Sequence, residues 1–337
     1  MTQSASIFLT GGSGFVGRHI VELFTKRGFK IRMLARRVPE RPIDASVEVV
    51  IGDLTQPETY REALRGTSAV VHAGLTDNFN ADVAATLALQ NLSAAAGVGK
   101  FIHLSSIVVS GTRPEGTITE ETPPEPAADA YSRAKLAIEQ GLLANSRAGE
   151  LLILRLGCVY GPGGGWWSNS LLNMMERGKL ILVNGGTGTA NLIHVDDVAG
   201  VIGTLLQPSN SQIGIFNLTD GTPVPWRTYF SGLESILGRT ATVSMTATEA
   251  LEYGKKWLRP SLPRRAFRKL LGSERIYPLD ARAIQSFASR AIYCNDKVCT
   301  VLGFKPMYDL QRGMETVRLD WDARRRTAMR AHSVPAN

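Results

Sequence analysis

Three side chains of this sequence have the types and spacing of an acid/base catalyst that acts on a carbonyl or hydroxyl group. Tyr131 and Lys135 stand four positions apart, and Ser106 precedes Tyr131 by 25 residues. On a helix, the four-residue spacing places the phenol and the ammonium on one face, one turn apart. A free tyrosine has a pKa of about 10, and a nearby positive charge lowers it towards a usable range. A serine hydroxyl from another element can hold the substrate oxygen beside the phenol.

A glycine-rich segment near the N-terminus has the form that binds a dinucleotide pyrophosphate. It runs Thr10-Gly-Gly-Ser-Gly-Phe-Val-Gly17, after the apolar residues 7–9 and before a helical pattern. Gly11 permits the tight turn, Gly14 lets the backbone approach a phosphate, and Gly17 lets the helix pack closely on the strand. The N–H groups that open the helix then face the phosphates. This strand–turn–helix context predicts a cofactor site rather than a plain glycine turn.

The end of the second strand indicates which dinucleotide binds. It reads Leu34-Ala35-Arg36-Arg37 and has no carboxylate of the kind that usually binds the ribose hydroxyls of NAD. The planar guanidinium of Arg36 can stack on adenine and bind a 2′-phosphate. The sequence therefore favours NADP(H) over NAD(H), and the alternative is a solvated basic strand end. Asp53, within Gly52-Asp53-Leu54, is placed to accept a hydrogen bond from an adenine amino group.

The elements that must position these residues alternate regularly in the first half of the chain. Strands that are apolar throughout and alternate with helices predict a parallel, doubly wound α/β sheet covered on both faces. The expected strands are 7–9, 30–35, 47–51, 69–73, 101–104 and 151–156, and the expected helices are 15–27, 57–64, 81–96 and 127–144.

The regularity weakens in the second half. We expect a mobile glycine turn over 161–167 and a basic tail that frays after Asp320. Residues 255–275 are basic with apolar side chains between the charges, which suits a membrane surface, an acidic substrate or a solvated face. Nucleic acid binding is not expected, because no known binding fold accompanies this charge. The remaining expected elements are helices over 168–177 and 226–237, a helix opening at His194 and a strand over 215–218.

Composition sets the wider limits. The chain has 337 residues, of which 44% are hydrophobic, so it can form one large domain or a domain with a smaller lobe. Its formal charge of +8 suits acidic partners, such as a phosphorylated cofactor, and also an ordinary basic enzyme. No apolar run approaches the roughly 20 residues that span a bilayer, and no signal peptide is expected. Three cysteines without a disulfide or zinc pattern predict a cytoplasmic protein with no metal site.

Together these segments resemble the extended short-chain dehydrogenase/reductase family, which includes the NAD-dependent epimerase/dehydratase group. The resemblance runs from about residue 5 to about residue 320, and the order and spacing of its motifs are very specific. Those motifs are Thr10–Gly17, Gly52-Asp53-Leu54, Val71-His72-Ala73-Gly74, Leu104-Ser105-Ser106, Tyr131-x-x-x-Lys135, Val159-Tyr160-Gly161-Pro162 and His194-Val195-Asp196-Asp197.

The resemblance implies a Rossmann-type sheet in residues 1–165 and a smaller substrate-binding lobe mainly in 166–325, followed by a basic tail over 326–337. It implies a small-molecule substrate and a homodimer formed through a helix bundle. Ser106 matches the catalytic serine, Tyr131 the acid/base, and Lys135 the residue that binds the nicotinamide ribose and lowers the tyrosine pKa. The expected cofactor contacts are Gly11, Gly14, Phe15, Val16, Gly17, Arg36, Arg37, Asp53, Leu54, Ala73, Gly74, Tyr131 and Lys135.

Departures from the family pattern narrow the reaction. Ile107 and Val108 follow Ser106, where the similar dehydratases carry acidic residues. Cys158 stands where sugar-nucleotide epimerases usually have Asn, and the arginine that they often carry before the His194 motif is missing. These differences favour a plain NAD(P)-dependent carbonyl reductase or alcohol dehydrogenase with a small or lipid-like substrate. The alternatives are a nucleotide-sugar epimerase or dehydrogenase, and a catalytically silent dinucleotide-binding regulator.

Several further residues have two interpretations. Trp166 and Trp167 suit either substrate contact or lobe packing. Cys158 is expected to be a small buried side chain rather than a pocket residue, and His194 a structural residue at a helix entry. His72 and His103 are expected to be packing residues.

Overall fold

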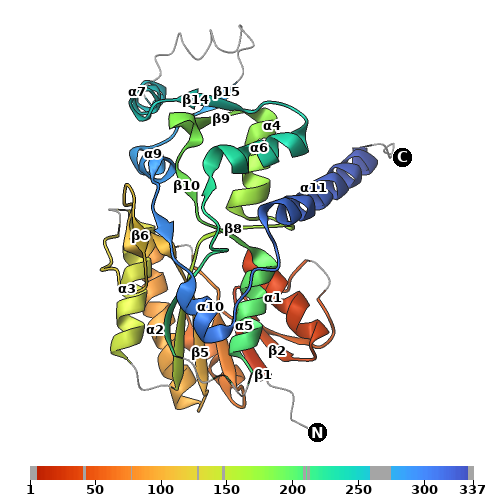
Figure 1. Cartoon of the computed structure of the whole chain (residues 1–337). Coiled ribbons are helices and arrows are strands. Elements are labelled where there is room, and N and C mark those ends of the chain that lie inside the picture. Colours follow the sequence, from red (N-terminus) through yellow and green to blue (C-terminus); the bar gives the residue numbers. More distant parts are fainter. Residues whose placement is uncertain are drawn as a thin grey trace.

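A single large sheet organises the lower part of the molecule in Figure 1. The structure is a computed structural model of the whole chain, and it describes residues 6–40, 43–76, 78–126, 129–145, 149–207, 210, 213–258 and 275–332. The strands of the large sheet are β1 (Ser6–Thr10), β2 (Lys30–Ala35), β3 (Val47–Ile51), β4 (Ala69–His72), β5 (Lys100–Ser106), β7 (Glu150–Leu156) and β12 (Gly214–Leu218).

The seven strands lie in the order β12-β7-β5-β4-β1-β2-β3, and every neighbouring pair is parallel. In β1, Ile7 and Leu9 belong to the core on one face and Phe8 to the core on the other. All three side chains are fully buried, as expected for a sheet with helices on both sides. The Rossmann-type fold predicted from the sequence is therefore confirmed, with β12 added at one edge.

Helices cover both faces of this sheet (Figure 1). On one face, α1 (Phe15–Lys26), α5 (Val195–Leu205) and α10 (Asp296–Leu302) contribute side chains such as Phe24 and Ile202 to the core. On the other face lie α2 (Phe79–Ala95) and α3 (Ala130–Ala144), which contribute Leu89 and Ile138. The helix α3 is the element that carries Tyr131 and Lys135.

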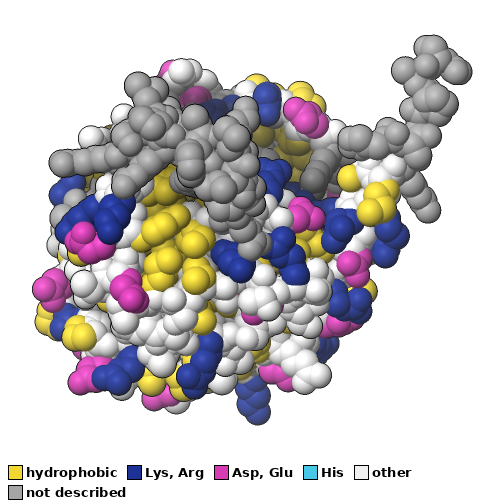
Figure 2. Space-filling model, turned by 90° about the horizontal axis from the view of Figure 1, so that it is seen from above, with side chains coloured by type: hydrophobic (Ala, Val, Ile, Leu, Met, Phe, Trp, Pro, Cys, Tyr) yellow, Lys and Arg dark blue, Asp and Glu magenta, His cyan; other side chains and the backbone are white. Residues whose placement is uncertain are grey.

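A second group of elements, which we call the C-terminal lobe, lies above the carboxyl ends of the strands. Its core gathers aromatic side chains such as Trp226, Tyr229 and Phe230. Seen from above in Figure 2, this face shows a group of hydrophobic side chains with Lys and Arg nearby. The lobe contains α4 (Leu171–Arg177), α6 (Trp226–Leu237), α7 (Ala247–Leu258), α9 (Ala281–Ala288), α11 (Leu310–His332) and the three-stranded sheet of β14 (Thr242–Met245), β9 (Gly178–Val183) and β15 (Arg275–Tyr277).

Three short strand pairs connect this lobe to the loops above the large sheet. They are β6 (Thr117–Ile118) with β16 (Ile292–Tyr293), β8 (Cys158–Tyr160) with β11 (Leu192–His194), and β10 (Thr189–Ala190) with β13 (Val224–Pro225).

Two local expectations were wrong. The tail does not fray after Asp320, because α11 continues to His332 and buries Val317 and Trp321 in the lobe core. The glycine turn accepts hydrogen bonds at the Gly163 carbonyl from Arg18 and at the Pro162 carbonyl from His19, and its mobility stays a prediction. The expected helix over 57–64 is instead two 3-10 turns, Pro57–Thr59 and Arg61–Leu64. The helix expected over 168–177 is present, as a π-helical turn over Gly165–Ser170 followed by α4.

The basic segment 255–275 is only partly described. Lys255 and Lys256 lie exposed in the last turn of α7, and Arg275 begins β15. The basic residues Arg259, Arg264, Arg265, Arg268 and Lys269 lie outside the described residues. Within the described part of the chain, no helix is both long enough and apolar enough to cross a membrane.

Candidate active site

The glycine loop joins β1 to α1 in a conformation that depends on its glycines. Gly11 has a φ of +72°, and a Cβ there would lie 2.6 Å from backbone atoms of Ala73 and Gly74. A Cβ on Gly17 would collide with the carbonyl oxygen of Gly11, so the helix packs against the loop as predicted. Gly14 is the N-cap of α1, and the nearest atom to a Cβ there is the Gly11 oxygen at 3.1 Å.

The start of α1 fits a bound pyrophosphate. No side chain caps this helix, so the N–H groups of Phe15, Val16 and Gly17 in its first turn are not satisfied by a capping residue. Such N–H groups, together with the positive end of the helix dipole, form an anion site. Residues Ala73 and Gly74 close the other side of the turn, where the Gly74 N–H donates to the Thr10 hydroxyl at 3.1 Å.

The residues expected near the adenosine lie at the ends of β2 and β3. Arg36 and Arg37 are exposed, and Arg37 lies 3.8 Å from Glu40. The Asp53 carboxylate accepts hydrogen bonds from the backbone and hydroxyl of Thr55, which lower its pKa, and the charge of Arg36 lowers it further. Arg36 and Asp53 are therefore neighbours. Leu54 instead buries its side chain in the sheet core, which leaves only its backbone for a cofactor.

The structure brings Ser106, Tyr131 and Lys135 together above the carboxyl end of β5. Ser106 ends that strand, and its hydroxyl accepts from the Val108 N–H at 3.4 Å. Lys135 is buried, and its Nζ donates to the Leu104 carbonyl at 2.9 Å and lies 6.0 Å from the centre of the Tyr131 ring. Asp129 caps α3 by accepting from the Ser132 N–H at 3.0 Å.

Burial dominates the electrostatics of this group. It raises the pKa of the Tyr131 phenol, while a hydrogen bond with Ser106 and the charge of Arg282 act in the opposite direction. The sequence predicts a lowered tyrosine pKa, and in this structure burial overrides that effect. Burial also lowers the pKa of Lys135 to about 8, against the opposing charges of Asp82 and Glu139. Below pH 8 this lysine still carries its charge.

The pKa of Lys135 leads to a pH-dependence that can be measured. The ordinary value is 10.5, so the folded protein loses this proton at lower pH than the unfolded chain does. The cost of burying the ammonium lowers the free energy of unfolding below pH 8, and this cost disappears between pH 8 and pH 10.5.

If turnover requires the charged lysine, kcat/KM falls above pH 8 as one proton is lost. Replacing Asp82 by Asn removes the largest opposing charge and is expected to shift this fall to lower pH in a pH–rate profile. If kcat/KM falls at the same pH in the Asp82→Asn variant, the fall is not due to Lys135.

A buried ion pair connects α3 to the sheet just behind these residues. Glu139 lies one helical turn beyond Lys135 and accepts hydrogen bonds from Arg155 of β7 at 2.8 Å and from Ser105 of β5 at 2.6 Å. The side chains of Glu139 and Arg155 are 2% and 4% exposed. Since Ser105 and Arg155 are register partners on adjacent strands, one carboxylate holds the helix against both strands.

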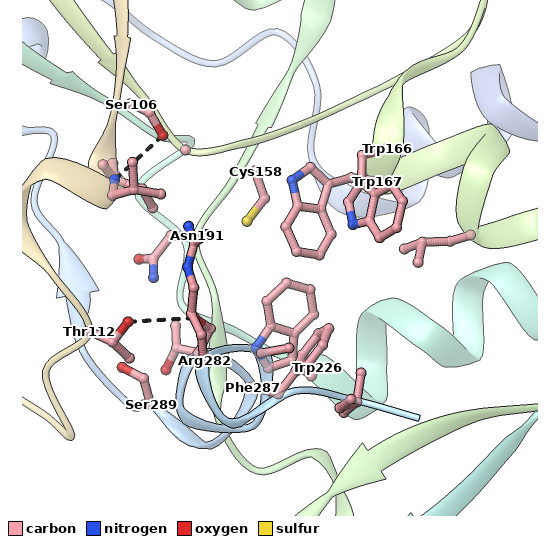
Figure 3. A pocket seen from close by; sticks show the side chains of 18 of the residues that line it. Ser106, Thr112, Cys158, Trp166, Trp167, Asn191, Trp226, Arg282, Phe287 and Ser289 are labelled. Atoms are coloured by element: carbon pink, nitrogen blue, oxygen red, sulfur yellow. Dashed lines mark hydrogen bonds between the residues drawn. The ribbon is translucent and has the colours of Figure 1, made fainter. Parts of the chain in front are cut away.

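A cavity of about 340 Å³ opens beside Ser106, between the sheet and the C-terminal lobe (Figure 3). One side is aromatic and includes Trp166, Trp167, Trp226 and Phe287. The other side is polar and carries Ser106, Thr112, Ser132, Asn191, Arg282 and Ser286.

The cavity resolves the open interpretations of several residues. Trp166 lines it with more than half of its surface exposed, and Trp167 both lines it and stacks on Trp226 at 5.1 Å between ring centres. Cys158 also lines it, and burial raises the pKa of its thiol to about 12. His194 is structural, as expected, because it caps α5 and stacks on Tyr308. His72 and His103 are buried in the sheet as predicted.

Sequence reasoning missed Asp129, Asp82, Glu139 and Arg282. Glu139 carried a usable signal, because it continues the four-residue spacing of Tyr131 and Lys135. Arg282 carried none, because it belongs to no motif and reaches the site from α9, some 150 positions after Tyr131.

Comparison with known proteins agrees with this arrangement. The model of the NAD dependent epimerase/dehydratase family matches residues 7–218. The chain is 28% identical over 258 residues to a 2′-dehydrokanamycin reductase of Streptomyces kanamyceticus, covering 73% of this chain and 71% of that protein. It is 24% identical to a 4-hydroxy-2-methyl-3-oxo-4-farnesyl-3,4-dihydroquinoline-1-oxide ketoreductase of Stigmatella aurantiaca, with coverage of 92% and 95%.

Among solved structures, MoeE5 in complex with UDP-glucuronic acid and NAD superposes with a TM-score of 0.72 at 22% identity. The superposition covers 95% of this chain and 100% of that one, and at this identity it supports the fold alone. The glycine loop, the parallel sheet and the family match lead to one conclusion: the chain belongs to the NAD dependent epimerase/dehydratase family and is an NAD(P)-dependent oxidoreductase.

Proposed function

We propose that this protein reduces the carbonyl group of a small, largely apolar substrate with NADPH. The observation that carries the proposal is the cavity, in which the Ser106 hydroxyl shares one space with a wall of tryptophan and phenylalanine side chains. Apolar pockets with a few convergent polar groups are the usual form of small-molecule sites. The names of the two relatives, a reductase and a ketoreductase, agree with this proposal.

The proposed mechanism assigns one role to each residue. A dinucleotide held by Gly11, Gly14 and the first turn of α1 would supply a hydride, with both electrons, for the carbonyl carbon. Tyr131 donates its proton to the oxygen, which becomes the alcohol, and Ser106 donates a hydrogen bond to that oxygen as its charge develops. Lys135 orients the ribose and supports the tyrosinate until solvent returns the proton. Ile107 and Val108, which line the cavity, offer no acid or base for an elimination.

NADPH turnover tests this function against its alternatives. Purified protein is expected to oxidise NADPH in the presence of apolar aryl ketones and to exchange the cofactor rapidly. UDP-glucose is expected neither to be converted nor to raise the melting temperature. Tightly retained NAD with epimerisation of UDP-glucose would overturn the reductase proposal in favour of the epimerase. Dinucleotide binding without turnover of any kind would favour a silent regulator.

The preference for NADP(H) is proposed to rest on Arg36. Its exposed guanidinium beside Asp53 can reach a 2′-phosphate, and hydrogen bonds between two charged groups are worth about 1.5–3 kcal/mol. Arg36→Gln is expected to weaken NADPH binding about 10- to 100-fold and NADH binding much less, as measured by fluorescence titration. Arg65→Gln removes one charge from another exposed ion pair, with Glu62, and serves as the control. An equal loss for both cofactors would contradict this role.

The remaining assignments are proposals that follow from the same family membership. Residues 1–165 are proposed to bind mainly the dinucleotide and 166–325 mainly the substrate. The protein is proposed to be a cytoplasmic homodimer whose helix bundle includes α3. Gel filtration with light scattering tests the dimer. Vesicles containing anionic lipid test a weak membrane contact of the basic segment 255–275.

A further inference from the structure

The polar side of the cavity contains one cation. Arg282 is the only positively charged side chain among the described residues that line it. The side chain leaves α9 and extends into the cavity between the aromatic wall and the wall that carries Thr112 (Figure 3). Its positive charge also reaches the Tyr131 phenol, whose pKa it lowers. The Arg282 side chain is 38% exposed, so a ligand in the cavity can reach its guanidinium.

A carboxylate behind the cavity orients this guanidinium. The Nη1 atom of Arg282 lies 2.9 Å from Oδ1 of Asp129, which caps the helix that carries Tyr131. Asp129 does not line the cavity. A guanidinium has five N–H donors, and one contact to Asp129 leaves the others for a ligand.

A second donor lies beside it. The Ser132 N–H donates to the same Asp129 oxygen at 3.0 Å, so Ser132 and Arg282 are held on one atom. Ser132 is among the residues that line the cavity, but its hydroxyl is buried and lies beside the Asp129 carboxylate, whose pKa it lowers. Asp129 therefore holds the start of α3 and the guanidinium of Arg282 in one fixed arrangement.

The N–H groups of Arg282 that do not face Asp129 suit a ligand that accepts hydrogen bonds. Asp280 is the only carboxylate on the described lining, and its Oδ1 already accepts from the Ala283 N–H at 2.7 Å. With a single arginine and two nearby aspartates, the site suits a monoanion better than a phosphate dianion. A carboxylate matches the planar donor arrangement of arginine.

We propose that Arg282 binds a carboxylate of the substrate, so that the protein acts on an oxo acid with an apolar body. The carbonyl lies at Ser106 and Tyr131, the acid group at Arg282, and the apolar body against Trp167 and Trp226. This inference rests on the proposed reductase function for its chemistry, although carboxylate binding can be measured without turnover.

Binding is measured by calorimetry on the full chain saturated with NADP⁺, using 4-phenylbutanoate and its neutral amide as probes. The carboxylate is expected to bind about tenfold or more tightly than the amide. Arg282→Gln is expected to abolish that difference and Arg282→Lys to keep part of it. Arg290→Gln is the matched control. Arg290 follows Arg282 by eight positions, is exposed, and pairs with Glu115. Equal binding of both probes by the parent protein, or discrimination that survives in Arg282→Gln, would overturn the proposal.

Turnover separates this inference from the proposed function. The substrates are 4-oxo-4-phenylbutanoate and its amide, each with NADPH, and circular dichroism confirms that each variant is folded. We expect kcat/KM to favour the acid in the parent protein and the preference to vanish in Arg282→Gln.

Equal reduction of acid and amide by both proteins refutes the role of Arg282 and leaves the proposed reductase function intact. Discrimination in binding with no turnover refutes the reductase and leaves the carboxylate site. If Arg282→Gln does not fold, a loss of discrimination in Arg282→Lys supports the site, and unchanged discrimination refutes it.

Discussion

Replacing Tyr131 by Phe is expected to lower kcat about 100- to 10 000-fold, which is the usual contribution of a positioned acid/base group. Only the hydroxyl is lost, so the ring remains packed 5.5 Å from that of Phe79, and Lys135 keeps its bond to the Leu104 carbonyl. The dinucleotide affinity is therefore expected to change little. Steady-state kinetics with saturating NADPH and a separate fluorescence titration of the cofactor measure the two effects.

A matched control is available in the C-terminal lobe. The Tyr253 hydroxyl donates to the Ile276 carbonyl at 3.3 Å and does not belong to the site, so Tyr253→Phe is expected to keep full activity. The kcat of Ser106→Ala is expected to lie between those of Tyr131→Phe and Tyr253→Phe. This variant loses a hydrogen bond to the developing alkoxide but keeps the proton donor. Turnover by Tyr131→Phe within a few-fold of the parent protein would show that another group delivers the proton.

Replacing Arg155 by Met is expected to destabilise the protein by about 3–5 kcal/mol, the cost of leaving a buried carboxylate without its partner. Glu139 would keep only the Ser105 hydroxyl at 2.6 Å, in a position that is 2% exposed. The helix α3 would then lose its strongest polar attachment to β7. Equilibrium denaturation in urea measures the free energy of unfolding, with the far-ultraviolet signal checking for a single transition.

Two further variants distinguish pairing from packing. In Glu139→Leu/Arg155→Met both charges are gone, so most of the lost stability is expected to return. Removing Arg290, whose ion pair with Glu115 at 2.6 Å is exposed, is expected to cost less than about 1 kcal/mol. If Arg155→Met were as mild as the Arg290 variant, the buried pair would not anchor the helix.

Both predictions concern side chains on one face of the helix α3. Tyr131, Lys135 and Glu139 follow at intervals of four residues, so the helix presents an acid/base, a cation and an anchor along one face. On β5, Ser105 contacts the anchor and Ser106 faces the cavity, because adjacent strand residues point to opposite sides. The pair of serines thus fixes the position of the phenol relative to the substrate oxygen.

The parts of the site that are local in sequence were predictable. The glycine loop forms its turn from local residues. A Cβ at Gly11 or Gly17 would collide with backbone atoms, which agrees with the roles inferred from their spacing. The helix periodicity placed Tyr131 beside Lys135, and the order of apolar strands predicted the sheet. Leu54 buries its side chain, so its expected contact with the cofactor stays a prediction that concerns its backbone.

What the sequence alone determined is therefore the local chemistry: a phosphate-binding turn, an acid/base helix, a serine at a strand end and the family to which they belong. The tertiary structure alone decided the properties that depend on distant segments. Burial, not the nearby lysine, sets the direction of the Tyr131 pKa, because the cost of removing water from the tyrosinate outweighs the hydrogen bond with Ser106 and the charge of Arg282. The cavity and Arg282 arise only when α9 lies against the loops above the sheet, since no short-range spacing links residue 282 to residue 129.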